Sequence, residues 1–96
     1  MKDKKEVEEF YIRLKDELDR TTKFPALYLY KFIVPTDDGK INQIETIFNN
    51  TGAVITTKTS SNGKYTSISI EVTMQSADAV IEKYKEVSVV EGVISL

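Results

Sequence analysis

The sequence predicts an α+β domain with a four-stranded antiparallel sheet, two helices on one face of it, and an extra helix at the N-terminus. Three observations predict this class. An Asn-Gly pair at positions 62 and 63 separates two runs with strand-like alternation. Apolar stripes with helical spacing lie between the predicted strands. The 96 residues suffice for one domain and hardly for two.

Residues 4–20 have the spacing of an amphipathic helix. Apolar residues recur at three- and four-residue steps, while most other positions are charged. They are Val7, Phe10, Tyr11, Leu14 and Leu18. Two placements remain open for this helix: it packs on its own domain, or it covers the open face of the sheet or a partner subunit.

Residues 26–34 form the first predicted strand, and both of its faces are largely apolar. Lys31 decides the orientation, because a lysine pointing into a helix-packed core would be unfavourable. Tyr28, Tyr30 and Phe32 are therefore expected to point inward. The opposite, open face is expected to carry Leu27, Leu29, Lys31 and Ile33.

A helix is expected to follow Pro35, with Asp37 or Asp38 as its N-terminal cap and its end near Asn50. Gly52 then supplies the left-handed conformation that commonly terminates a helix. The apolar side of this helix consists of Ile41, Ile44, Ile47 and Phe48.

The stretch 53–74 is predicted to be a β-hairpin with a two-residue type I′ turn at Asn62 and Gly63. Ser61 would then face Lys64, and Ile55 would pair with Ile70. One face of this hairpin collects Ala53, Ile55, Thr57, Ile68, Ile70, Val72 and Met74. The other collects Thr56, Lys58, Tyr65, Ser67, Ser69, Glu71 and Thr73, with Val54 as its single aliphatic residue.

Ser76 is expected to cap a second helix that runs to about Val87. The last strand is expected at 92–96, with Ile94 and Leu96 inward. Right-handed crossovers then give a ferredoxin-like βαββαβ sandwich with strand order 4-1-3-2 and all neighbours antiparallel. We expect a single domain over 1–96, with a leading helix within 1–22 and the core within 24–96.

The composition removes several kinds of chemistry. The chain has no cysteine and no histidine, so it has neither a thiol nucleophile nor the usual general base, and no thiolate or imidazole metal ligand. The net charge of −2 gives no indication of a nucleic-acid partner or an anionic membrane surface. No apolar run reaches membrane-spanning length. We expect a cytoplasmic protein without cofactor, metal or catalytic residues, and not an enzyme.

Two local clusters have a functional and a plainer interpretation. The hairpin tip, with Lys58, Ser60, Ser61, Lys64 and Tyr65, has the groups to hold an anion, but polar turn residues are also the usual composition of a solvated tip. The adjacent carboxylates at 37 and 38 have the chemistry of half a hard-metal site, but are also typical helix caps.

Two stretches resemble the YbeD-like family of small bacterial proteins of unknown function. They are Phe24-Pro-Ala-Leu-Tyr-Leu-Tyr-Lys-Phe-Ile33 and Lys58-Thr-Ser-Ser-Asn-Gly-Lys-Tyr-Thr-Ser-Ile-Ser-Ile70, and the layout of 79–96 is also similar. The resemblance implies a ferredoxin-like fold similar to ACT regulatory domains, which bind small molecules or self-associate. The chain departs from the family in its longer leading helix and in Thr59, where proline is frequent.

Apolar residues on the open face must be covered or must bind something. We therefore expect a non-enzymatic regulatory or adaptor domain that associates with an unknown protein or with itself. The alternative is an ACT-like sensor that binds a metabolite at a dimer interface. The surface expected to carry either function consists of Leu27, Leu29, Lys31, Lys58, Ser60, Ser61, Lys64 and Tyr65.

Overall fold

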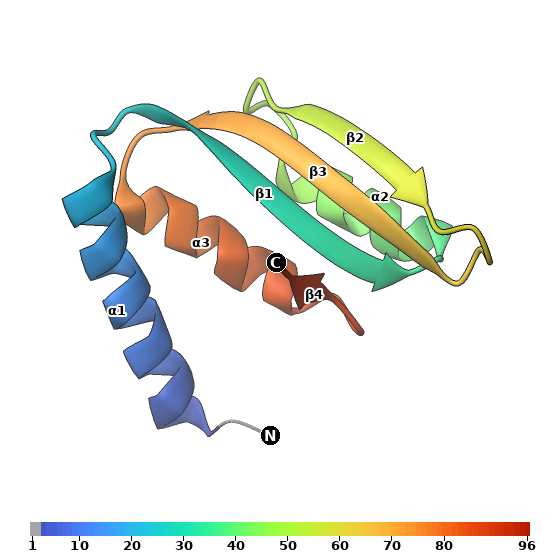
Figure 1. The fold of residues 1–96 in the computed structure, drawn as a ribbon, viewed down its shortest axis with the longest axis horizontal. Helices are drawn as coiled ribbons and strands as arrows, with labels where there is room; N and C mark the ends of the chain where they lie inside the picture. The colour runs from blue at the N-terminus through green and yellow to red at the C-terminus, as the bar shows by residue number, and fades with distance from the viewer. Residues whose placement is uncertain (1–2) are drawn as a thin grey trace.

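The computed structural model describes residues 3–96, and Figure 1 shows the arrangement of its elements. They are α1 (Lys4–Thr21), β1 (Ala26–Pro35), α2 (Asp38–Ile47), β2 (Val54–Thr59), β3 (Tyr65–Met74), α3 (Ala77–Ser88) and β4 (Ile94–Ser95). The sheet is four-stranded with the order β2-β3-β1-β4, and all neighbouring strands are antiparallel. Read from β4, this is the predicted order 4-1-3-2.

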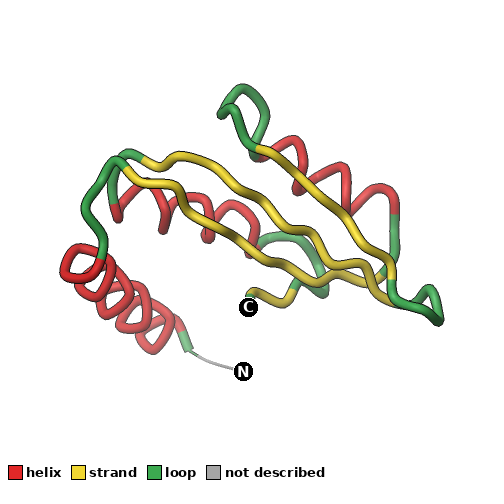
Figure 2. The backbone as a smooth tube through the Cα atoms, turned by 45° about the horizontal axis from the view of Figure 1, so that its top comes forward, coloured by secondary structure: helices red, strands yellow, loops and turns green. Residues whose placement is uncertain are grey.

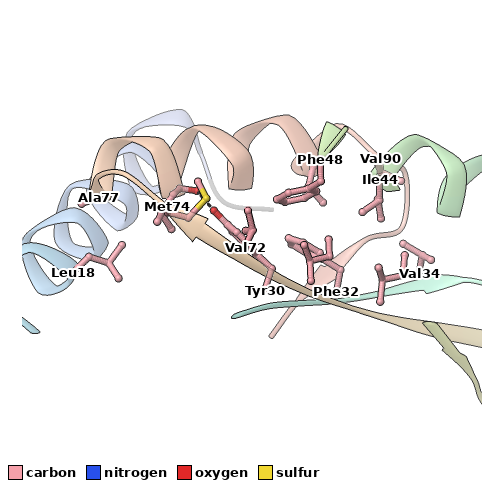
Figure 3. Close-up of a cluster of buried hydrophobic side chains, with 14 residues drawn as sticks. Leu18, Tyr30, Phe32, Val34, Ile44, Phe48, Val72, Met74, Ala77 and Val90 are labelled. Atoms are coloured by element: carbon pink, nitrogen blue, oxygen red, sulfur yellow. Dashed lines mark hydrogen bonds between the residues drawn. The ribbon is translucent and has the colours of Figure 1, made fainter. Parts of the chain in front are cut away.

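The core lies between the sheet and the layer formed by α2 and α3, which cover the same face (Figures 1 and 2). Figure 3 shows β1 side chains pointing toward Ile44 of α2 and toward Phe48, which directly follows this helix. The fully buried large side chains include Tyr30, Phe32, Ile44, Ile68 and Ile70. The opposite side of the sheet, which we call the open face, has neither of these helices over it.

The predicted orientation of β1 is confirmed. Tyr30 and Phe32 are completely buried, whereas Lys31 is exposed on the open face. The hydroxyl of Tyr30 donates to the carbonyl oxygen of Val80 at 3.0 Å, and those of Tyr28 and Tyr84 lie 2.9 Å apart. Burial raises the pKa of Tyr30 and of Tyr84 far above the ordinary value, with the neighbouring tyrosines adding to the shift.

The two helices of the core, α2 and α3, each have a side-chain cap at the N-terminus, as predicted. Asp37 accepts from the backbone N–H of Lys40 at 3.1 Å, and Ser76 accepts from that of Ala79 at 3.1 Å. The first of these helices ends at Ile47 rather than near Asn50. The N–H groups of residues 48 and 49 bond to carbonyls only three residues back, which tightens and terminates the helix.

The hairpin has the predicted register, including Thr59 opposite Thr66 and Ile55 opposite Ile70. The predicted type I′ turn is wrong, because Gly63 has a positive φ of 75° but Asn62 does not share this conformation. The side chain of Asn62 instead accepts from the Ser60 hydroxyl and the Lys64 N–H, which favours a wider loop. The strand pairing ends at Thr59 and Thr66, one further backbone bond joins the Ser60 N–H to the Tyr65 carbonyl at 2.8 Å, and the pairing does not continue to Ser61.

The prediction for the last strand is wrong in length and in direction. β4 spans only Ile94–Ser95, and Ile94 lies opposite Ile33, a residue of the open face. Paired residues of neighbouring strands point to the same side, so Ile94 and Leu96 face outward. They are 52% and 66% exposed, while Val93 packs against the core.

The leading helix α1 packs on its own domain, beside α3 and away from the open face (Figure 1). Leu18 is buried in the core, where Figure 3 shows it near Ala77 and Met74. The Lys15 ammonium lies 3.1 Å from the Asp78 carboxylate on α3. The sequence left open whether this helix packs on its own domain or covers the open face or a partner subunit. In the structure it packs on its own domain.

Candidate functional site

The open face is built from side chains of all four strands, because alternate residues of each strand point to it. Cross-strand pairing defines its rows: Leu29 lies opposite Glu71, Lys31 opposite Ser69, and Ile33 opposite Ser67. By strand, its members are Val54, Thr56 and Lys58; Tyr65, Ser67, Ser69, Glu71 and Thr73; Leu27, Leu29, Lys31 and Ile33; and Ile94 with the adjoining Leu96.

Large aliphatic side chains on this face are strongly exposed. Leu27 is 68% exposed and Leu29 is 60% exposed, and both were predicted to lie here. Val54, Ile94 and Leu96 are similarly exposed but were not among the predicted site residues. The run Val93-Ile94-Ser95-Leu96 contains no charged residue that would select a face as Lys31 does in β1. Its alternation with Ser95 favours an inward Ile94 and Leu96, which is the wrong direction.

The backbone hydrogen bond from the Leu96 N–H to the Lys31 carbonyl, 2.9 Å long, extends the pairing of β4 by one position. It brings Leu96 beside Lys31, as Ile94 is beside Ile33. Apolar side chains therefore continue from β1 to this edge of the sheet, while the middle strand β3 contributes mostly hydroxyls.

A hollow of about 370 Å³ lies on the open face next to the hairpin tip. It is lined by Ile33, Lys58, Thr59, Ser60, Ser61, Tyr65 and Ser67. Four of the predicted site residues, those at 58, 60, 61 and 65, are thus brought together. Lys64, which was predicted with them, is not part of the lining.

Three backbone donors of the tip, the N–H groups of residues 63–65, are already occupied. The N–H of Gly63 bonds to the Ser60 carbonyl, and the N–H of Lys64 bonds to the Asn62 side chain. The N–H of Tyr65 bonds to the Ser60 hydroxyl, which itself donates to Asn62. The tip thus uses these three N–H groups and the Ser60 hydroxyl for its own closure, so they do not point to an anion.

Tyr28 and Tyr30 face the helices, and Tyr65 is the half-exposed tyrosine of the open face. Asp37 serves as the cap of α2. Within residues 3–96 no three His, Cys, Asp or Glu side chains gather as a metal site, and no helix has the length and apolar character to cross a membrane.

Comparison with known proteins agrees with the predicted resemblance. Residues 19–96 match the family described as "Protein of unknown function (DUF493)". A curated relative, the "UPF0250 protein" of Shewanella sediminis (strain HAW-EB3), is 31% identical over 83 residues, which cover 83% of this chain and 94% of the relative. No solved structure matches the chain.

The matched range begins at Asp19, so most of α1 precedes it. Neither description states an activity. The family match and the bacterial relative confirm the resemblance to the YbeD-like proteins, and the chain belongs to the DUF493 family.

Proposed function

We infer that residues 1–96 form a single domain. Its core, within 24–96, is of the ferredoxin-like type and similar to ACT domains, and the extra helix α1 precedes this core. After α1 the elements follow the order strand, helix, strand, strand, helix, strand. The sheet order β2-β3-β1-β4 supports this assignment.

We propose that the chain is a non-enzymatic regulatory or adaptor domain that acts by binding protein, either another chain or itself, through the open face. One observation carries the proposal: Leu27 and Leu29 stay 68% and 60% exposed on a face that α1 does not cover. With Val54, Ile94 and Leu96 they form a set of exposed aliphatic residues on one side of the sheet. Such grouped apolar surface is typical of protein interaction sites.

The proposal of a non-enzymatic role is supported by the arrangement of the charged groups on the open face. Lys58 lines the hollow at the hairpin tip, but Glu71 and Lys31 do not. An acid–base pair in a shared hollow would need a lysine and a carboxylate within hydrogen-bond reach of one bound group. The open face has no histidine to supply that role instead.

The test is site-specific photo-crosslinking inside the cells that express the protein. A photoreactive residue at position 29 is expected to give a covalent product whose protein component is identified by mass spectrometry. The same residue at Val89, which is 73% exposed at the end of α3, is the matched control. Equal products at both positions, or none at position 29, would contradict the proposal.

A second candidate function is a small-molecule sensor, and the hollow at the hairpin tip favours it. Lys58 offers a positive charge there, Ser61 offers a hydroxyl, and Tyr65 offers a ring face. A ligand with an anionic group and an apolar part fits these side chains. A metabolite panel should then raise the melting temperature by about one degree or more, and the Tyr65→Ala variant should lose this shift. Equal shifts in both proteins would exclude the hollow as the binding site.

A further inference from the structure

Two opposite charges lie diagonally on the open face. Lys31 of β1 is opposite Ser69, and Glu71 of β3 is opposite Leu29, so the two charged residues are one strand and two positions apart. Both are exposed, and neither takes part in an ion pair within residues 3–96. A diagonal pair of unlike charges is what a two-fold interface can satisfy twice, once from each copy.

We propose that a second copy of this chain packs against the open face, with a two-fold axis between Lys31 and Glu71 in the plane of the interface. Each Lys31 then meets the Glu71 of the other copy. This inference rests on the proposed function and specifies its partner and its geometry.

The same rotation also matches the aliphatic residues. On a sheet with strands about 4.8 Å apart and successive same-face residues about 6.7 Å apart, Leu29 lies almost on the axis and meets its own counterpart. Leu27 falls next to Leu96 of the other copy, and Ile33 falls next to Val54. One operation thus sets lysine against glutamate and aliphatic against aliphatic residues.

The geometry also predicts the strength of the dimer. The strands of the two sheets cross at roughly 70°, close to the orthogonal class of sheet packing. Two crossed four-stranded sheets overlap over a square of roughly 20 Å side, which corresponds to about 800 Å² of buried surface over the two faces. This area is below that of a standard specific interface and in the range of weak, transient ones, so we expect a dimer that dissociates on dilution at micromolar concentrations.

Charge reversal tests the predicted contact. Sedimentation of the full chain over a dilution series should show a monomer–dimer equilibrium. Lys31→Glu and Glu71→Lys should each weaken it about tenfold or more, because each places like charges together twice. The double variant K31E/E71K should recover most of the wild-type affinity. A double variant no better than the single ones would overturn the predicted register.

A crosslink at the axis tests the geometry independently. The chain has no cysteine, so Leu29→Cys introduces the sole thiol. Packed sheets are about 10 Å apart, so a bismaleimide of about that span should join two copies. The control is Val89→Cys, which lies outside the open face and should not crosslink. Urea denaturation of every variant shows whether it is folded.

The outcomes separate this inference from the function on which it rests. If Leu29→Cys crosslinks but the charges fail to compensate, the register is wrong and association through the open face stands. If the purified chain stays monomeric and position 29 crosslinks to an identified different protein in cells, the second copy is wrong and the proposed function stands. A monomer without any product at position 29 contradicts both.

Discussion

Ile33 of β1 lies directly opposite Ile94 of β4, and both side chains point to the open face. This pairing turns the C-terminal residues outward, contrary to the alternation expected for 92–96. It also leaves Val93 against the core and joins Leu96 to Lys31 through a backbone hydrogen bond. The aliphatic surface of β1 is thereby extended to the edge of the sheet.

Neighbouring residues of the last strand should differ in their contribution to stability. Val93→Ala should lower the free energy of unfolding by about 1 kcal/mol, because its side chain packs on the core. Ile94→Ala should change it by less than about 0.5 kcal/mol, because this side chain is half exposed. Urea denaturation at a concentration where the chain is monomeric measures both. A larger loss of stability for Ile94→Ala than for Val93→Ala would mean that the inward and outward residues of β4 are assigned the wrong way round.

The attachment of α1 should depend on one buried side chain. Leu18→Ala should cost about 2–4 kcal/mol of unfolding free energy, since Leu18 is 7% exposed and lies in the core. Lys15→Ala should cost less than about 0.5 kcal/mol, because the Lys15–Asp78 pair is exposed to solvent. Denaturant titration of the two variants gives the comparison, and similar costs would argue against the packing described for α1.

The two adjacent aspartates before α2 should not be equivalent. Asp37→Ala should lower the free energy of unfolding by about 1 kcal/mol, because it removes the acceptor of the Lys40 N–H. Asp38→Ala, in the first turn, should cost only a few tenths of a kcal/mol through the helix dipole. Magnesium or calcium should leave the melting temperatures unchanged. A metal-dependent shift lost in both variants would instead assign these carboxylates to a metal site.

The buried tyrosines should make the fold sensitive to alkali. Burial holds the pKa of Tyr30 above its ordinary value of 10.0, so the folded state keeps the proton that the unfolded chain releases. The contribution of the protonated tyrosine to stability is therefore fully present below pH 10. Above pH 10 the free energy of unfolding should fall by about 1.4 kcal/mol per pH unit for each such tyrosine. Urea titrations between about pH 8 and 11 on the wild type and Tyr30→Phe provide the check. Identical pH slopes in the two proteins would contradict the prediction.

The sequence was most informative where one residue type has few compatible environments. Lys31 selected the open face of β1, and Ser76 marked the start of α3 through its side-chain cap. For α2 the sequence left Asp37 and Asp38 open as the cap, and the structure uses Asp37. The place of the Asn62-Gly63 pair and the alternation around Ile55 and Ile70 together predicted the hairpin register that the structure has. The turn itself was mispredicted, because the contacts of the Asn62 side chain favour a wider loop.

The candidate site was predictable only in part. Leu27, Leu29 and Lys31 follow from the pattern of a single strand, and the hollow gathers the predicted hairpin-tip residues with Ile33. The outward direction of Ile94 and Leu96 depends on which residue of β1 each one meets. That register is set by packing between distant segments, and a short apolar run does not encode it locally.

By itself, the sequence determined the number, type and order of the elements and the buried face of β1, because these follow from local periodicity and from the cost of burying a charge. Only the tertiary structure decided that α1 packs beside α3 through Leu18, and that β4 turns Ile94 outward. An amphipathic helix and an apolar strand can each bury against more than one surface. The choice rests on contacts that form when remote parts of the chain meet.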